Sequence, residues 1–270
     1  GPMGSAPELQ AFAFGDDPGF PFAPRNEVLL GKSRFCQVKF KSGEKIIEKL
    51  IFDKNGKQKL REICKTKMEN FASLGADIVI APCNTFHKIY HDLQDNNSLP
   101  MPSIIEAVSN SVLNMGIKNI GLLGTTFTIN NRLYHDILEN KGVTVTTLSP
   151  EQNKDVRGAI QLIKVGNFYD KPTESFISDF FQANPCLKDE CNFGNSAYDT
   201  IMQAISSLHD KGVSHVILGC TELPLIFDQM SSTYEVQMSF EHLDDQIDDK
   251  TVTLLDSTYI LAESAVSAIL

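Results

Sequence analysis

The feature that most constrains the fold is a repeated alternation of short apolar runs with longer amphipathic segments. The apolar runs predict strands, mostly buried on both faces, over 36–40, 76–82, 119–124, 143–148, 215–219 and 251–255. The amphipathic segments predict helices over 57–74, from 83 to 94, from 125 to 140, over 150–165 and 196–211, and at the C-terminus. This alternation predicts an α/β fold, in which helices cover both faces of a parallel sheet.

The strand and helix cycles are more numerous than one small sheet needs, so we expect two similar lobes. The first lobe is expected to take residues 29–110 and 228–270, and the second is expected to take 111–227. Residues 1–28 are interpreted as a tag remnant followed by an N-terminal arm rich in Phe and Pro. Residues 167–195 break the alternation and are interpreted as an insertion in the second lobe.

Composition excludes several classes of protein. The chain of 270 residues has a formal charge of −10, which disfavours nucleic-acid binding because phosphate contacts need basic patches. It has no secretory signal pattern and no apolar run of the length that a membrane span needs, so we expect no membrane segment. Six cysteines are too few for a disulfide scaffold of this size, and a reducing cytoplasm is the expected setting.

Two cysteines directly follow predicted strands. Cys83 lies in Ala-Pro-Cys-Asn-Thr at 81–85, and Cys220 lies in Gly-Cys-Thr-Glu at 219–222. The carboxyl ends of parallel strands face the ligand crevice in open α/β sheets. A following helix also favours a thiolate at its N-terminus. The pattern therefore indicates two reactive thiols, although the alternative of two inert buried cysteines stays open on residue pattern alone.

Two opposed thiols suit proton transfer at the α-carbon of an amino acid. A thiolate removes the α-proton, and a thiol returns a proton on the opposite face. The α-carbon is a very weak acid, so the site must also stabilise the developing negative charge with preorganised donors. Cys83 and Cys220 are far apart in the sequence and are expected to come from different lobes.

Taken in order, the motifs of this chain resemble those of the aspartate/glutamate racemase family, and in particular its aspartate racemase branch. The resemblance runs from about Phe52 to the C-terminus. It is carried by Pro-Cys-Asn-Thr at 82–85 with His87, Gly-Leu-Leu-Gly-Thr-Thr at 121–126, Asp-Val-Arg-Gly-Ala-Ile at 155–160, Lys-Val-Gly-Asn at 164–167, Gly-Cys-Thr-Glu at 219–222 and Leu-Leu-Asp-Ser-Thr at 254–258.

The resemblance implies two Rossmann-like lobes with the active site in the cleft between them, and often a homodimer. It implies a reaction without pyridoxal phosphate and without a metal, and it implies that Cys83 and Cys220 are the catalytic pair. It also implies a set of substrate-binding residues, which are Asn84, Thr85, Thr125, Thr126, Lys164, Thr221 and Glu222. Lys164 would approach a substrate carboxylate, and Glu222 would either hold the substrate ammonium or support Cys220.

The start of the chain departs from the family pattern. Relatives begin with a strand and a glycine-rich turn, which the residues before Cys36 do not provide. The family arginine for the distal carboxylate has only Arg25 and Arg34 as candidates by location. A missing first strand would remove one wall of the pocket.

Side chains that could suggest a metal site are interpreted otherwise. His87 and His91 have no third ligand at suitable spacing, and we interpret them as surface residues or as residues behind the site. Cys186 and Cys191 have no second pair and are interpreted as loop cysteines.

The function predicted from the sequence is cofactor-independent racemisation of an acidic amino acid, with aspartate preferred over glutamate. Two alternatives stay open. One is a different reaction of the same superfamily, such as hydantoin racemisation, maleate isomerisation or decarboxylation. The other is an amino-acid-binding protein without catalytic activity, which the altered N-terminus favours.

Overall fold

The computed structural model describes residues 54–91, 99–227, 231–241 and 247–268. The N-terminal arm, the predicted strand at 36–40 and the two candidate arginines lie outside these residues.

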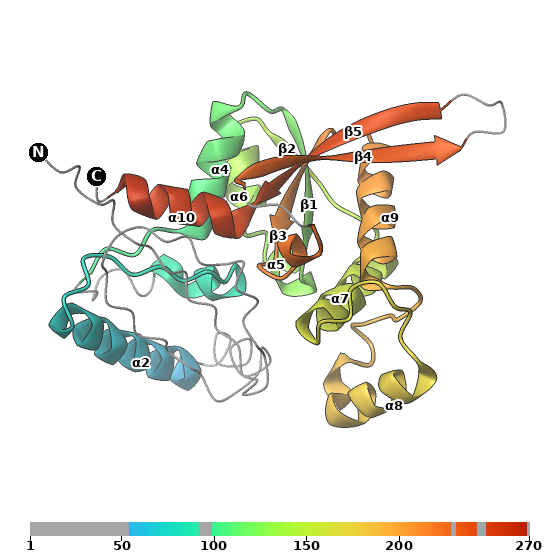
Figure 1. The fold of residues 1–270 in the computed structure, drawn as a ribbon. Helices are drawn as coiled ribbons and strands as arrows, with labels where there is room; N and C mark the ends of the chain where they lie inside the picture. The colour runs from blue at the N-terminus through green and yellow to red at the C-terminus, as the bar shows by residue number, and fades with distance from the viewer. Residues whose placement is uncertain (1–53, 92–98, 228–230, 242–246, 269–270) are drawn as a thin grey trace, which may run out of the picture. The chain divides into compact units, whose positions relative to one another are not determined.

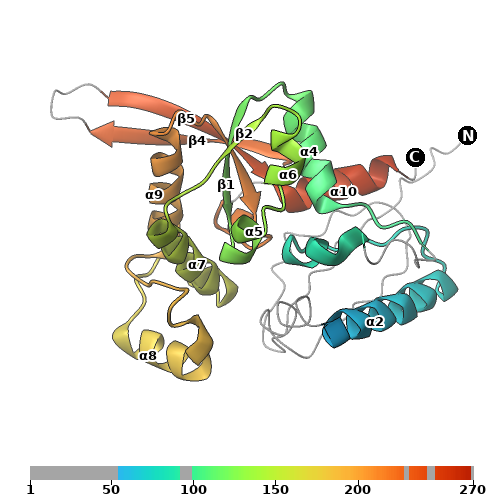
Figure 2. The same cartoon turned by 180° about the vertical axis from the view of Figure 1, so that it is seen from behind.

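The described chain forms two compact units (Figures 1 and 2). The first contains residues up to 107 together with 258–268, and the second contains 108–257. The lobe boundaries expected from the sequence stay a prediction, and each unit is described by itself below.

The first unit contains the predicted amphipathic helix. Helix α2 (Lys54–Ser73) confirms that prediction, with a start three residues earlier. The predicted strand at 76–82 is wrong, because these residues have no regular secondary structure. A strand needs a ladder of hydrogen bonds to a neighbour. In the described part of the chain, Ala76 N–H donates to Phe71 O in α2 and Val79 N–H donates to Pro100 O, each at 3.0 Å, and these two bonds to different segments do not make a ladder.

A short helix follows Cys83. The 3₁₀-helix η2 (Thr85–Ile89) begins the helix that was predicted to run to residue 94, and residues 92–98 lie outside the described part. Helix α4 (Ile104–Asn114) was not predicted. Its first turn is capped by Ser103, whose Oγ accepts a hydrogen bond from Glu106 N–H at 3.2 Å.

The second unit is built on one five-stranded sheet with the order β2-β1-β3-β5-β4. Its strands are β1 (Asn119–Gly124), β2 (Thr144–Thr146), β3 (His215–Gly219), β4 (Thr233–Glu241) and β5 (Ile247–Asp256). The first four strands of that order are parallel, and β4 pairs antiparallel with β5. The prediction of an α/β fold with a mainly parallel sheet is confirmed.

Strand β4 was missed because it is not an apolar run. Its residues alternate between polar and apolar from Thr233 to Val236, as expected of a strand at the edge of a sheet.

Helices flank this sheet on both faces. The helices of the second unit are α5 (Thr126–Asn130), α6 (His135–Glu139), α7 (Pro150–Lys164), α8 (Glu174–Ala183), η3 (Pro185–Leu187), α9 (Ala197–His209) and η4 (Leu223–Ile226), of which α8 and η3 lie away from the sheet. Helix α10 (Ser257–Ser267) follows β5 and belongs to the first unit from residue 258 onward. Figure 1 shows α7 and α9 on one side of the sheet, with α6 on the other. The single helix predicted up to residue 140 is divided into α5 and α6, with a turn between them where Arg132 has φ +53°.

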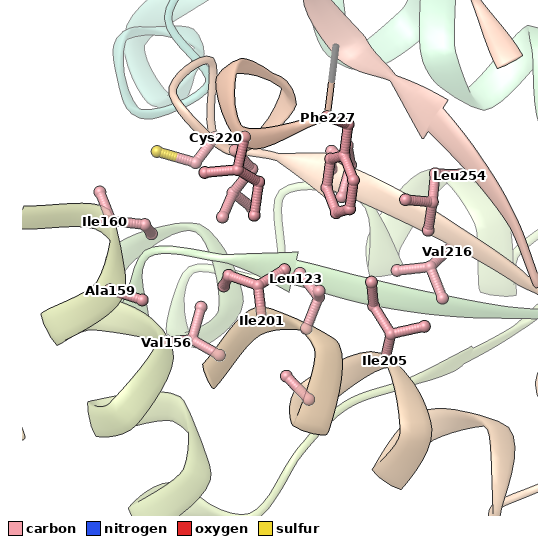
Figure 3. Close-up of a cluster of buried hydrophobic side chains, with 14 of the residues drawn as sticks. Leu123, Val156, Ala159, Ile160, Ile201, Ile205, Val216, Cys220, Phe227 and Leu254 are labelled. Carbon is pink, nitrogen blue, oxygen red and sulfur yellow. The ribbon is translucent and has the colours of Figure 1, made fainter. Parts of the chain in front are cut away.

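The core of the second unit lies between the sheet and helices α7 and α9 (Figure 3). Leu123, Val216 and Leu254 face these helices from three adjacent strands. The alternate residues Leu122 and Ile217 are also fully buried, so both faces of the sheet are covered. This packing fixes the carboxyl ends of β1, β3 and β5 relative to the end of α7.

Candidate active site

The carboxyl ends of β1 and β3 are held in register by a pair of glycines. Gly124 lies opposite Gly219, so Thr125 and Cys220 follow at the same edge of the sheet. A Cβ on Gly219 would lie 2.9 Å from the carbonyl oxygen of Leu123, which leaves no room for a side chain. The two strands therefore approach closely where the candidate residues begin.

Two threonines follow β1. Thr125 is buried and caps α5, because its Oγ1 accepts a hydrogen bond from Thr128 N–H at 3.2 Å. Thr126 is the first residue of that helix and is half-buried. Thr125 thus has a structural role in this state, and Thr126 is the more exposed of the two.

Cys220 is the first residue after β3, and its thiol is in contact with a carboxylate. Its Sγ donates a hydrogen bond to Glu222 Oε2 at 2.9 Å, and Thr221 Oγ1 donates to the same oxygen at 3.2 Å. The other carboxylate oxygen of Glu222 lies 3.7 Å from Lys164 Nζ. Three predicted site residues therefore form a chain of thiol, carboxylate and ammonium: Cys220 and Glu222 from the turn between β3 and η4, and Lys164 from α7.

The thiol of Cys220 also lies at the border of the core. The residue is buried, and Figure 3 shows its sulfur directed away from the apolar side chains of Phe227, Val216 and Leu254. The carbonyl of Cys220 accepts a hydrogen bond from Leu223 N–H at 3.1 Å, which starts η4. This hydrogen bond restrains the backbone of the turn that carries Cys220 and Glu222.

Tyr134 lies near Cys220 and was missed by the sequence analysis. It is fully buried, and its ring comes within 3.5 Å of the position of a Cβ on Gly219. Burial raises the pKa of its phenol above the ordinary value, and a negative charge on Cys220 raises it further whenever that thiol is ionised. Tyr134 falls in a predicted helix with no motif around it, so no sequence signal indicated this proximity.

In the first unit, Cys83 is half-buried and stands before η2. Its backbone N–H donates to Ala81 O at 2.8 Å. The next two predicted residues, Asn84 and Thr85, are buried. The structure therefore places Cys83, Asn84 and Thr85 together, and it places the other predicted residues in the second unit.

His87 contacts the Cys83 backbone. Its Nδ1 lies 2.8 Å from Cys83 O, and its Nε2 accepts a hydrogen bond from Ile104 N–H at 3.1 Å. Desolvation lowers the pKa of this buried imidazole to about 4, although the backbone carbonyls of Cys83 and Pro102 oppose the shift. His87 therefore lies behind Cys83 as a neutral ring.

The described residues contain no cluster of three His, Cys, Asp or Glu side chains that could hold a metal ion. His91 and Cys186 are exposed, and Cys191 is buried. Every helix in the described part of the chain is too short or too polar to cross a bilayer.

Comparison with known families decides the classification. Residues 38–265 match the family model described as Asp/Glu/Hydantoin racemase. The chain belongs to the Asp/Glu/Hydantoin racemase family. The resemblance inferred from the motifs is thereby confirmed at the level of the family, and most of this family member lies inside the match.

Two relatives share about a quarter of their aligned residues with this chain. This chain is 27% identical over 153 residues to an uncharacterized protein of Pectobacterium carotovorum, and the match covers 57% of this chain and 81% of that protein. It is 24% identical over 196 residues to a broad specificity amino-acid racemase of Bacillus subtilis, a match of 73% of this chain. That second match spans 66% of the Bacillus protein, just under two thirds of its length.

Solved structures share the fold. An aspartate racemase homologue from Pyrococcus horikoshii has a TM-score of 0.58 with this chain at 20% identity, and the match covers 95% of this chain and 96% of that one. The likeness confirms the α/β architecture of the family member.

Proposed function

We propose that the protein is a cofactor-independent racemase of an acidic amino acid, with Cys83 and Cys220 as the two acid/base residues. The observation that carries the proposal is the chain of Cys220, Glu222 and Lys164 at the carboxyl end of β3, within a member of the racemase family. The racemase from Bacillus subtilis supports an amino acid as substrate.

The contacts of Cys220 suit the role of proton donor. A thiol that donates its hydrogen to Glu222 is protonated, and the adjacent carboxylate disfavours a second negative charge. Lys164 offsets part of that charge, because its ammonium lies 3.7 Å from the other oxygen of Glu222. In the proposed resting state Cys220 is a thiol and Cys83 is the thiolate.

The proposed reaction transfers two protons. The Cys83 thiolate takes the α-hydrogen as a proton, and the electron pair of the broken C–H bond stays on the substrate. Cys220 then gives its S–H proton to the opposite face of the α-carbon and becomes the thiolate. The opposite enantiomer is converted by the same steps in reverse, and each passage leaves the two cysteines with exchanged protonation states.

Charged and hydroxyl groups around Cys220 are proposed to bind the substrate. Lys164 is proposed to approach a substrate carboxylate, with Thr125, Thr126 and Thr221 as hydrogen-bond donors on the same side of the sheet. Glu222 is proposed to support Cys220 and not to hold the substrate ammonium, because it already accepts the thiol hydrogen. Asn84 and Thr85 are proposed to bind substrate beside Cys83.

The first experiment is proton NMR of the reduced protein with L-aspartate in D2O, without added cofactor and with L-glutamate in parallel. Loss of the α-proton signal together with appearance of the D-isomer is expected, and it is expected to be faster with aspartate. An unchanged signal for both amino acids from folded protein would contradict the proposal. Thermal stabilisation by the same ligands would then favour the amino-acid-binding protein.

Single cysteine variants test the mechanism. Cys83→Ser and Cys220→Ser are each expected to abolish racemisation, since one proton transfer is lost, while retaining α-proton exchange with one enantiomer. The exchanged enantiomer should differ between the two variants. Cys186→Ser, which changes an exposed cysteine, is the control and should keep full turnover. Full turnover by either of the first two variants would exclude the two-thiol mechanism.

We also propose that the protein is a homodimer, as the family resemblance implies. Sedimentation equilibrium is expected to give twice the mass of the 270-residue chain. A monomer at all concentrations that support activity would exclude it.

A further inference from the structure

His87 uses both of its ring nitrogens within the first unit. Nδ1 lies 2.8 Å from the carbonyl oxygen of Cys83, and Nε2 lies 3.1 Å from the amide nitrogen of Ile104. Ile104 is the first residue of α4, where the backbone N–H groups have no acceptor inside the helix. One imidazole thus bridges the backbone of Cys83 and the start of a helix.

The two contacts fix the position of the ring proton. A backbone N–H can only donate, so Nε2 of His87 must be the unprotonated nitrogen that accepts from Ile104. The proton is therefore on Nδ1, which donates to Cys83 O. Burial supports the same neutral state.

Aromatic neighbours restrain the ring. Tyr90 stacks on His87 with ring centroids 5.2 Å apart and an angle of 19° between the planes. Phe86 meets the imidazole edge-on at 6.1 Å. The hydroxyl of Tyr90 donates to Met101 O at 2.6 Å, which ties the stacked ring to the segment that leads into α4. The imidazole is therefore held on one face by a ring that is itself fixed.

These contacts restrict the backbone at Cys83. Its carbonyl is anchored by His87, and its N–H donates to Ala81 O at 2.8 Å. Because a peptide unit is planar, anchoring the carbonyl sets the torsion between the Cα and the carbonyl carbon of Cys83. The Cβ that carries the thiol is attached to the same Cα, so the direction of the Cα–Cβ bond depends on that anchor.

We infer that His87 is a positioning residue for Cys83: its Nδ1–H fixes the backbone of Cys83, and its Nε2 ties that backbone to the first turn of α4. This inference rests on the proposed function only for its effect on turnover. The effect on the thiol itself follows from the contacts within the first unit.

Two amide variants separate the hydrogen bond to Cys83 O from the hydrogen bond to Ile104 N–H. In His87→Asn the side-chain amide nitrogen replaces Nδ1, so the donor to Cys83 O is kept and the acceptor for Ile104 is lost. In His87→Gln the side-chain carbonyl replaces Nε2, so the acceptor for Ile104 is kept and the donor to Cys83 is lost. His91→Gln is the matched control, because it makes the same substitution at an exposed histidine of the same segment and leaves both contacts of His87.

The primary measurement is the rate at which iodoacetamide alkylates Cys83, resolved by mass spectrometry, with the exposed Cys186 as internal reference. His87→Gln is expected to raise the Cys83 rate by roughly threefold or more, because the released loop opens more often. His87→Asn and His91→Gln are expected to stay within about twofold of the wild type. An unchanged Cys83 rate in His87→Gln would overturn the inference, as would equal increases in His87→Gln and His87→Asn.

The second measurement is turnover. If the protein racemises, His87→Gln should lower kcat by about tenfold to a hundredfold with KM nearly unchanged, because a displacement of about 1 Å has an effect of that order. His87→Asn should recover most of the loss. Equal kcat values in the two variants would overturn the positioning role. A protein that does not racemise at all would contradict the proposed function, while the alkylation rates would still decide the role of His87.

Discussion

At the scale of single residues, the two cysteines have different polar partners. The thiol of Cys220 donates to a carboxylate that also lies near an ammonium group. Cys83 is instead restrained through its backbone by a neutral imidazole. The Cys220 thiol therefore lies beside charged groups, whereas the position of the Cys83 thiol depends on a hydrogen bond to its backbone.

The charge beside Cys220 gives a direct prediction. Glu222→Gln removes a negative charge next to the thiol and leaves the Lys164 ammonium in place. The variant should be alkylated at Cys220 faster than the wild type, by up to about tenfold, because the thiolate is no longer disfavoured by the carboxylate. Turnover should fall. Glu151→Gln, an exposed carboxylate at the start of α7, is the control for the change of net charge. Slower alkylation of Cys220 in Glu222→Gln would contradict this account.

The burial of His87 predicts a pH dependence of folding. Its pKa in the folded chain is about 4, below the ordinary value of 6.5, so the unfolded chain binds more protons between these values. The contribution of His87 to stability is thus fully present above about pH 6.5 and is lost as pH falls toward 4, by up to about 1.4 kcal/mol per pH unit.

Urea unfolding at pH 4.5, 5.5 and 7 tests this dependence. The free energy of unfolding of the wild type should fall toward that of His87→Phe as the pH falls, because the variant has no imidazole at position 87 to protonate. Burial also lowers the pKa of His135 and of His215, but both side chains are present in the two proteins and their effects cancel in the difference. A difference that does not change with pH would refute the neutral role of His87.

At the scale of elements, helix α7 delivers Lys164 to the site. Its N-terminus is closed by a capping box, in which Ser149 Oγ accepts from Gln152 N–H at 3.3 Å and Gln152 Oε1 accepts from Ser149 N–H at 3.1 Å. Lys164 lies in the last turn, where the helix dipole favours a positive charge. The start of the helix is therefore fixed by local bonds, and its end carries the cation.

A glycine in the middle of α7 allows the loop after η3 to pack against that helix. A Cβ on Gly158 would lie 1.8 Å from the carbonyl oxygen of Asn192, which is a backbone atom that cannot turn aside. Gly158→Ala should therefore lower the free energy of unfolding by about 1–3 kcal/mol, although alanine is the better helix former. Gly194→Ala is the control, since a Cβ there meets no atom within 4 Å. Equal stability of the two variants in urea would refute the close contact.

At the scale of the whole molecule, the proposed catalytic cysteines belong to different compact units. Cys83 lies in the unit that contains residues up to 107, and Cys220 lies in the unit of residues 108–257. A two-thiol mechanism requires both to reach one α-carbon. The proposed mechanism therefore requires both units to act on the same ligand.

Hydrogen exchange tests this dependence. Saturating L-aspartate should slow amide exchange both at residues 83–90 and at residues 220–226. At a ligand concentration of 100 times Kd it should stabilise the folded protein by about 2.7 kcal/mol. Protection confined to one unit would show that this unit binds the ligand alone, and it would exclude the proposed mechanism.

The sequence by itself determined the elements whose signal is local. Strands β1 and β3 begin and end where the apolar runs do, and α7 and α9 match the predicted helices within two residues at each end. The positions of Cys83 and Cys220 at the ends of their apolar runs could also be read directly. Periodicity, capping and burial of a continuous apolar run all act within one segment, so the residues of that segment carry the information.

Only the tertiary structure decided which neighbours these segments have. Residues 76–82 carry an apolar run like that of β1 but do not form a strand, because a strand also needs a paired neighbour. The contact of Glu222 with Lys164 joins residues that are distant in the sequence, and so does the bond of His87 to Ile104. Such contacts depend on how the elements pack, and the residues of one segment do not contain that information.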